Sequence, residues 1–119
     1  MAYVDGYVLP VPVKSIAAYR RIAKKAGAIW REHGALEYKE WVAEDLNADE
    51  LVPFTPGVQA IPDETVIFAY IVFKSRAHRD RVNAKVMKDD RMHKMMDPTD
   101  PIFDVKRMAY GGFKTIVDL

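Results

Sequence analysis

Two histidines, His33 and His78, are the residues of this chain best suited to acid–base chemistry near neutral pH. His33 lies in the last turn of an amphipathic segment, where the helix dipole favours a charged ring and burial favours a neutral one. His78 lies three residues after Ser75, which can cap a helix, so the positive helix end keeps its imidazole neutral. We therefore predict both as catalytic residues, with His78 or His33 as a base. The alternative for each ring is a structural role, bonded to a backbone carbonyl.

Aromatic and amide side chains supply the predicted ligand-binding residues. Trp41, Tyr70 and Tyr110 lie in β-rich segments, and Asn83 follows in the same helical segment as His78. A glycine pair directly after Tyr110 leaves room for a ligand, and Trp30 is placed to close the helix side of a pocket. Core packing is the competing interpretation, because aromatic residues at core spacing bury large areas.

Other chemistry is poorly represented. The chain has no cysteine, which excludes disulfides, zinc ribbons and thiol nucleophiles. The phosphate-binding patterns GxxxxGK and GxGxxG and the nucleophile pattern GxSxG are absent. One cluster, Met92, His93, Met95 and Met96, has the ligand types of a copper(I) site, although methionines more often fill gaps or make contacts. We expect no metal and no cofactor.

The elements that position these residues follow the order β-α-β-β-α-β. The predicted strands are Tyr3–Leu9, Leu36–Val42, Thr65–Phe73 and Val105–Val117, and the predicted helices run from Ile16 to Gly34 and from Ser75 to about Lys88. Pro10 and Pro12 are expected to stop the first strand from continuing as a central strand. Ser15 is expected to cap the first helix, and His33 is expected to project into its apolar face. Long links at 46–63 and 90–104 complete the chain.

This order is that of a single ferredoxin-like α+β domain spanning residues 1–119, an antiparallel sheet with two helices on one face. The third strand is apolar on both alternating faces, so both faces of the sheet require cover. Two helices cover one face only. We therefore predict a homodimer in which two sheets pack face to face.

Composition limits the partners. The net charge is +1 and the pI about 7.9, and basic residues are not interleaved with exposed aromatics, so we expect no nucleic-acid binding. No apolar run approaches the roughly 20 residues of a membrane span, and the first residues do not resemble a signal peptide, so we expect no membrane association and a cytoplasmic location. The helices are basic and residues 35–65 acidic, a division that fits self-association or simply solvated helix faces.

Four segments resemble the YbaA-like family of bacterial proteins of unknown function, also described as domain of unknown function 1428. They are YVDGYVLPVP at 3–12, AGAIWREHGALEY at 26–38, SRAHRDRVNAKVM at 75–87 and KRMAYGGFKTIVDL at 106–119. The family's Asp-Pro-Arg after the second helix is here Asp89-Asp90-Arg91. The resemblance implies the dimeric α+β barrel superfamily, which includes cofactor-free oxygenases, haem-handling enzymes and simple ligand binders. It supplies no catalytic residues to transfer.

Together these observations predict a homodimer with a small apolar pocket in each subunit. Its activity would be a cofactor-independent oxygenation or isomerisation of a small apolar or aromatic molecule. The alternative is a non-catalytic ligand-binding or stress-related interaction module, in which both histidines are structural.

Overall fold

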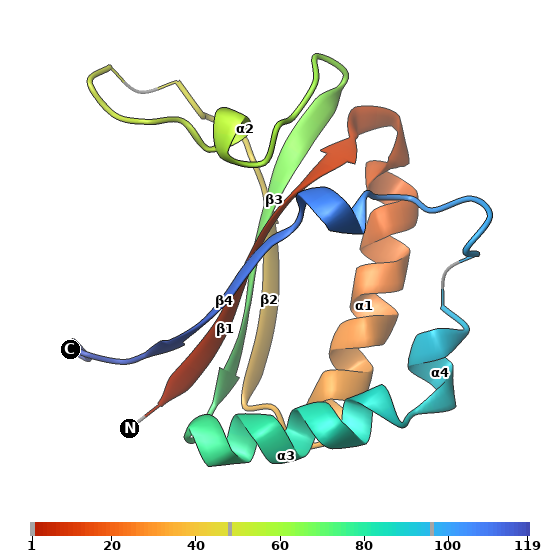
Figure 1. Ribbon diagram of the computed structural model, residues 1–119, viewed down its shortest axis with the longest axis vertical. Helices are drawn as coiled ribbons and strands as arrows, with labels where there is room; N and C mark the ends of the chain where they lie inside the picture. The colour runs from red at the N-terminus through yellow and green to blue at the C-terminus, as the bar shows by residue number, and fades with distance from the viewer. Residues whose placement is uncertain (1, 48, 96) are drawn as a thin grey trace.

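The computed structural model describes residues 2–47, 49–95 and 97–119 of the chain (Figure 1). The strands are β1 (Tyr3–Pro12), β2 (Glu37–Val42), β3 (Glu64–Phe73) and β4 (Ala109–Lys114), and the helices are α1 (Ile16–Glu32), α2 (Phe54–Gly57), α3 (Arg76–Met87) and α4 (Asp90–His93). Short 3-10 helices cover Val13–Ser15 and Val105–Arg107. The predicted order of the main elements is confirmed.

The four strands form one antiparallel sheet in the order β2-β3-β1-β4. The two central strands pair along their whole length, from Tyr3 opposite Phe73 to Pro12 opposite Glu64. β4 pairs with β1 only from Tyr3 to Val8, and β2 closes the other edge by pairing with β3. This is the predicted ferredoxin-like α+β sheet.

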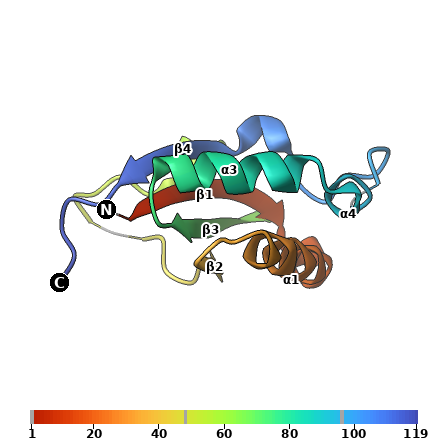
Figure 2. The same cartoon turned by 90° about the horizontal axis from the view of Figure 1, so that it is seen from below.

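The two long helices lie on the same side of the sheet but cover it differently. α1 runs along the strands near β2, whereas α3 crosses one end of the sheet close to β1 and β4 (Figures 1 and 2). The end covered by α3 is sealed by Phe73, Val82, Val86 and Trp30. Farther along the sheet the helix-covered face is closed instead by residues 97–108, among them Phe103 and Met108. This division leaves space beside α1.

The prediction that Pro10 and Pro12 end the first strand is wrong. β1 continues through Pro12 and remains paired with β3. The backbone N–H of Val13 donates to the Asp63 carbonyl at 2.9 Å, which shows that the odd-numbered residues of this strand direct their backbone N–H groups toward β3. Because the direction alternates along a strand, the backbone nitrogens of the even-numbered residues, Pro10 and Pro12 among them, point to the opposite side. That side is the β4 side, where pairing ends at Val8. Neither proline therefore removes a ladder hydrogen bond.

Helix and strand ends also differ from expectation in part. Ser15 precedes α1 as predicted, but its hydroxyl accepts no capping hydrogen bond, because a 3-10 turn leads directly into the helix. Ser75 does cap α3, accepting from the His78 backbone N–H at 3.1 Å. The last strand is shorter than predicted, since Val105–Arg107 forms a 3-10 turn held by the Asp104 side chain.

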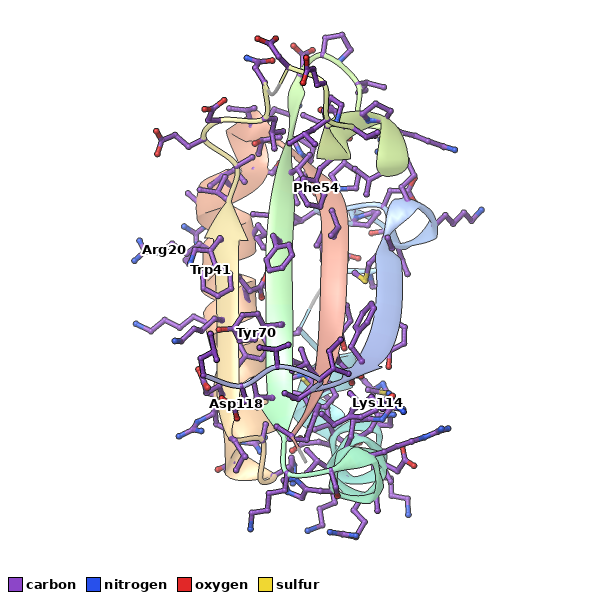
Figure 3. The ribbon with its side chains drawn as sticks, turned by 90° about the vertical axis from the view of Figure 1, so that its left-hand side faces the viewer. Arg20, Trp41, Phe54, Tyr70, Lys114 and Asp118 are labelled. Carbon is purple, nitrogen blue, oxygen red and sulfur yellow. The ribbon has the colours of Figure 1, made fainter. Side chains whose placement is uncertain are left out.

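The sheet face opposite the helices is largely bare. Residues 49–63 cover only one end of it, where Val58 and Val66 are buried. Elsewhere Trp41 is 45%, Phe68 44% and Phe113 62% exposed. Figure 3 looks onto this face and shows the side chains of Trp41 and Tyr70 standing on it. We refer to it as the open face.

Candidate functional site

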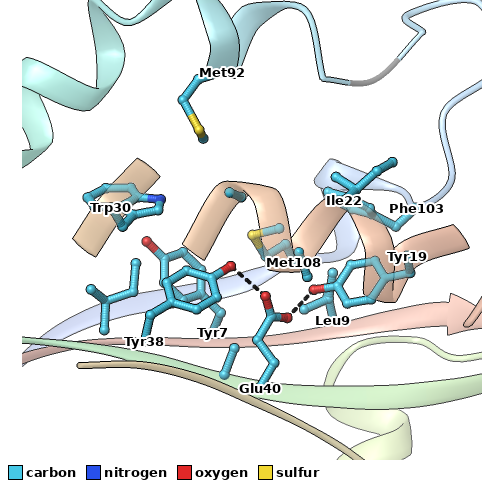
Figure 4. Close-up of a pocket in the computed structure, with 14 residues that line it drawn as sticks. Tyr7, Leu9, Tyr19, Ile22, Trp30, Tyr38, Glu40, Met92, Phe103 and Met108 are labelled. Atoms are coloured by element: carbon cyan, nitrogen blue, oxygen red, sulfur yellow. Dashed lines mark hydrogen bonds between the residues drawn. The ribbon is translucent and has the colours of Figure 1, made fainter. Parts of the chain in front are cut away.

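A cavity of about 210 Å³ lies between α1 and the helix-covered face of the sheet (Figure 4). It is mostly apolar, and fourteen residues line it: Tyr7, Leu9, Tyr19, Ile22, Ala23, Ala26, Trp30, Tyr38, Glu40, Ala69, Ile71, Met92, Phe103 and Met108. Every strand contribution comes from alternate residues of β1, β2 and β3, because side chains two apart in a strand share a face. The cavity is the candidate functional site.

Small side chains on α1 and the placement of α3 create this space. Ala23 and Ala26 face the sheet where larger residues would fill the gap. α3 packs at the end of the sheet, so the outer wall comes from Met92 of α4 and from Phe103 and Met108. Trp30 lines the helix side, as predicted.

Glu40 is the one carboxylate in the cavity wall. The hydroxyl of Tyr19 donates to its Oε1, and the hydroxyl of Tyr38 donates to its Oε2 at 2.5 Å (Figure 4). Charge-assisted O–H···O⁻ bonds of this kind are among the stronger hydrogen bonds in proteins. The two phenols therefore fix the position of the carboxylate and share its negative charge.

Two other polar groups of the wall have no such partner. Among the residues that the structure describes, the Tyr7 hydroxyl and the Trp30 indole N–H make no hydrogen bond. Neither atom is sealed away from solvent, since no fully buried side-chain nitrogen or oxygen in the described part of the chain lacks a partner. Both residues line the cavity, and both donors remain free for a further hydrogen bond.

The tyrosines of the site stay protonated over the ordinary pH range. Burial raises the pKa of Tyr7 well above its usual value, and the negative charge of Asp5 adds to the shift. Burial likewise raises the pKa of Tyr19 and Tyr38, and their hydrogen bonds to Glu40 raise it further. All three hydroxyls therefore act as donors rather than as phenolates.

Gly27 of α1 allows Tyr38 to reach Glu40. A Cβ atom at Gly27 would lie 2.5 Å from Cδ1 and 2.8 Å from Cε1 of Tyr38, far inside van der Waals contact. The aromatic ring therefore packs directly on the helix backbone. No other residue type leaves that space.

A shallow groove runs along the outer side of the same wall, between α1 and the edge strand β2. It is lined by Arg20, Ala23, Lys24, Gly27, Ala28, Arg31, Tyr38 and Glu40. Three of these residues, Ala23, Tyr38 and Glu40, also line the cavity. The groove and the cavity are therefore adjacent compartments separated by one layer of side chains.

The two predicted catalytic histidines lie outside the cavity wall. His33 follows α1 rather than facing its apolar side, and its Nε2 lies 2.8 Å from Oδ2 of Asp89. Arg91 also donates hydrogen bonds to the Asp89 carboxylate. Together the bonds from Arg91 and from His33 depress the pKa of the Asp89 carboxyl far below its ordinary value. This cluster ties the end of α1 to the junction of α3 and α4.

His78 is bonded within its own turn. Its Nδ1 accepts from the Lys74 backbone N–H at 3.0 Å, and its ring packs edge-on against Phe73 with centroids 5.9 Å apart. Burial lowers the pKa of His78, and nearby Lys74, Arg81 and Lys85 lower it further. The lowered pKa favours the neutral ring, and its contacts are those of a helix cap.

The four predicted ligand-binding residues divide between the two faces of the sheet. Trp41 and Tyr70 stand on the open face, with ring centroids 5.0 Å apart (Figure 3). Tyr110 projects to the helix side, where its hydroxyl donates to Asp5 at 3.1 Å and accepts from Arg79 at 2.6 Å. Asn83 is half-buried on α3, away from the cavity wall.

The structure brings two of these residues together elsewhere. Tyr70 and Tyr110 both border a hollow of about 420 Å³ beside β1, with Gly6 and Gly111. The Phe113 ring lies over both glycines, since a Cβ atom added at Gly6 or Gly111 would come within 3.4 or 3.2 Å of it, and the wall of the hollow is apolar. Tyr7, which borders both the hollow and the cavity, lies 5.1 Å from Tyr110 by ring centroid.

The described members of the methionine-rich cluster have separate surroundings. Met92 lines the cavity, His93 bonds the Met87 carbonyl at 2.7 Å, and Met95 borders a separate surface groove. Met96 lies outside the described residues. In the described ranges, no three histidine, aspartate or glutamate side chains gather as a metal site, and no helix is long and apolar enough to cross a membrane.

Sequence reasoning missed Glu40 and its tyrosines. The signal was the alternation in β2, which places Tyr38 and Glu40 on one face and Trp41 on the other. An acidic residue between apolar neighbours on the inward face of an edge strand is unusual. Tyr19, on the sheet-facing side of α1, is the matching donor.

The profile described as protein of unknown function (DUF1428) matches residues 2–105. The chain belongs to the DUF1428 family. It is 41% identical over 118 residues to the uncharacterized protein YbaA of Escherichia coli K12, covering 99% of each chain, and equally similar to YbaA of Shigella flexneri. The family assignment made from the four segments is therefore confirmed.

Solved structures support the fold. A crystal structure of a NIPSNAP family protein with unknown function from Agrobacterium tumefaciens superposes with a TM-score of 0.62 at 17% identity, covering 96% of this chain and 87% of the other. A second crystal structure of the same protein, Atu4242, gives a TM-score of 0.61 at 16% identity, covering 94% of this chain and 91% of the other. At these identities the likeness concerns the α+β fold alone.

Proposed function

We propose that this DUF1428 protein binds a small, largely apolar, single-ring molecule that carries a carbonyl or hydroxyl group, and that Glu40 transfers a proton on it. The observation that carries this proposal is the pairing of unbonded donors with a carboxylate. Tyr7 and Trp30, whose hydroxyl and indole N–H make no hydrogen bond among the described residues, line the same cavity as Glu40. A few polar groups in a mainly apolar wall are typical of small-molecule sites.

The size of the cavity favours a single ring. An apolar cavity of about 150 Å³ is sufficient to bind benzene. At about 210 Å³ this cavity has room for a ring with a short substituent but not for a fused-ring cofactor. The aromatic and methionine side chains around it supply contacts for such a ring.

The proposed chemistry is proton abstraction next to a carbonyl. Glu40 accepts the proton from carbon, the C–H electron pair forms the enolate double bond, and the carbonyl electrons move to oxygen. The Tyr7 hydroxyl and the Trp30 N–H then stabilise that oxygen, and return of the proton to the same carbon restores the carbonyl compound with that hydrogen exchanged. In a substrate with a C=C bond next to the deprotonated carbon, return of the proton to the far end of that bond completes an isomerisation. Carboxylate bases paired with phenol donors perform such reactions without a cofactor.

A non-catalytic binding protein is the second candidate. It is favoured by the state of Glu40, because both carboxylate oxygens already accept hydrogen bonds from tyrosines. Such bonds stabilise the anion and make it a weaker base. In that case Glu40 orients a bound hydroxyl group and no proton leaves carbon.

Deuterium exchange separates the two candidates. The full chain is titrated with phenylacetone in D₂O, and NMR follows both its binding and the exchange of the protons next to its carbonyl. Glu40→Gln should leave binding within a few fold and slow exchange by about 10²–10⁴-fold, the usual contribution of a general base. Glu37→Gln, on the same strand but on the open face, is the matched control.

Each result has a clear meaning. Binding without protein-dependent exchange supports the binding protein and contradicts the proton-transfer step. Exchange that survives Glu40→Gln also refutes it. A complete lack of binding by phenylacetone, by the corresponding alcohol and by phenol rejects the cavity as a site for single-ring compounds.

We also propose that two chains pair through their open faces. The exposure of Trp41, Phe68 and Phe113 on one face supports this, since a continuous apolar surface of this kind usually marks an interface. Sedimentation velocity at micromolar concentration should show a dimer, and Phe68→Lys should convert it to a folded monomer. Met87→Lys, at an exposed apolar position on α3, should leave the dimer intact. A monomeric wild-type protein would refute the pairing.

A further inference from the structure

The groove outside the cavity is basic. Arg20, Lys24 and Arg31 are its cationic residues, and Glu40 is its single acidic residue. The three cations follow one stripe of α1, because residues four, seven or eleven apart return to the same side of a helix. With about 380 Å³ of space, the groove is large enough for a charged group and its water.

Two of these cations have no acidic partner. Within the described residues, neither Arg20 nor Lys24 makes an ion pair or a side-chain hydrogen bond. Figure 3 shows Arg20 extending outward beyond the edge of β2 at the level of Trp41. Arg31 is different, since its Nη1 donates to the carbonyls of Ala35 and Leu36 and thereby fixes the chain after α1. Arg20 and Lys24 are therefore available to an anion.

The groove and the cavity meet at Ala23. Its methyl side chain is the smallest part of the wall that they share, and Tyr38 and Glu40 form the rest. The wall is thinnest at Ala23, so a linker that joins a ring inside the cavity to a charged group outside would have to pass there. The two phenol hydrogen bonds hold Glu40 in place beside that path and spread its charge.

We propose that the ligand is an aryl-alkyl carboxylate: its ring occupies the cavity and its anionic group lies in the groove beside Arg20 and Lys24. This inference rests on the proposed function, because it assumes that the cavity takes the ring. It adds the chemical class of the substituent. The three cations outweigh the single carboxylate, so an anion is favoured over an ammonium group of the same length.

Three matched probes test the charge. 3-Phenylpropionate, 3-phenylpropanol and 3-phenylpropylamine share one ring and chain and differ in the terminal group. Their dissociation constants are measured with the full chain by NMR titration at low and at moderate salt. The acid should bind most tightly, and its advantage over the alcohol should shrink as salt rises, since exposed charges are screened.

Two charge-matched double variants locate the effect. Arg20→Gln with Lys24→Gln should weaken binding of the acid by about fivefold, the value expected for two exposed ion pairs, and leave the alcohol unchanged. Arg21→Gln with Lys85→Gln removes the same net charge from positions that line neither compartment, and should change neither probe.

The outcomes separate this inference from the proposed function. If the alcohol binds as tightly as the acid, if the amine binds most tightly, or if both double variants have equal effects, the groove does not select an anion and the inference is wrong. If none of the three probes binds, the cavity itself is not a ring site and the proposed function fails with it.

Discussion

Substitution of Gly27 by alanine should destabilise the protein, although the same change in an ordinary helix interior stabilises by about 1 kcal/mol. The added Cβ would lie 2.5 Å from the ring of Tyr38. Overpacking of this kind costs about 2 kcal/mol. Displacement of the ring also disturbs the hydrogen bond from Tyr38 to Glu40, at a further cost of about 1 kcal/mol. With the helix gain subtracted, the expected loss is about 2 kcal/mol.

Urea unfolding followed by far-UV circular dichroism measures this loss, at one fixed protein concentration so that any association is constant. For a chain of this size the melting temperature should fall by about 8 °C. Ala28→Gly at the neighbouring exposed position measures helix propensity alone and should cost about 1 kcal/mol.

A double-mutant cycle with Tyr38→Ala gives the decisive comparison. Once the ring is removed, Gly27→Ala should become stabilising by about 1 kcal/mol. The argument is refuted if Gly27→Ala stabilises the native protein, or if its effect is the same with and without the Tyr38 ring.

Three further predictions concern charged groups. Asp5 is 1% exposed and lies 2.9 Å from Arg79, so Arg79→Met leaves it as a buried charge without its counter-ion. Urea unfolding should show a loss of about 3–5 kcal/mol in the free energy of unfolding, and a loss below about 1 kcal/mol would contradict the pairing. Two Arg107 nitrogens donate to Glu64 at 2.6 and 2.7 Å and depress the pKa of its carboxyl, so the ion pair stabilises the fold above the ordinary pKa of 4.5 and less as the pH falls. The difference in unfolding free energy between the wild type and Glu64→Gln should therefore disappear in acid, and a difference that stays constant with pH would refute this. Burial lowers the pKa of His78, so on acidification the imidazole of the unfolded chain is protonated before that of the folded chain, and stability falls as the pH drops below about 6.5. His78→Gln should reduce the fall in melting temperature between pH 8 and pH 5. An equal fall in the variant and the wild type would count against this.

The order of elements was predictable because hydrophobic period and capping residues are local signals. The Ser75 cap and the continuous apolar run of β3 determined their elements from a few neighbouring residues. The error at Pro10 and Pro12 arose because the cost of a proline depends on whether its side of the strand is paired, and that is set by where β4 ends. A single strand cannot indicate the length of its neighbour.

The site was harder to predict than the fold. His33 and His78 were selected for their intrinsic pKa, yet both have structural partners: His33 makes a tertiary contact with Asp89, and His78 accepts from the Lys74 backbone within its own turn. Glu40 was overlooked because its importance depends on two tyrosines, one distant in sequence, that meet it only after folding.

The prolines of β1 have a consequence beyond the fold. Past Val8 the β4 side of this central strand has no neighbouring strand, and Pro10 and Pro12 place two residues without an amide hydrogen there. A foreign strand that approached this border would find no donors with which to form a ladder. The two prolines thereby protect this apolar part of β1 from cross-β aggregation.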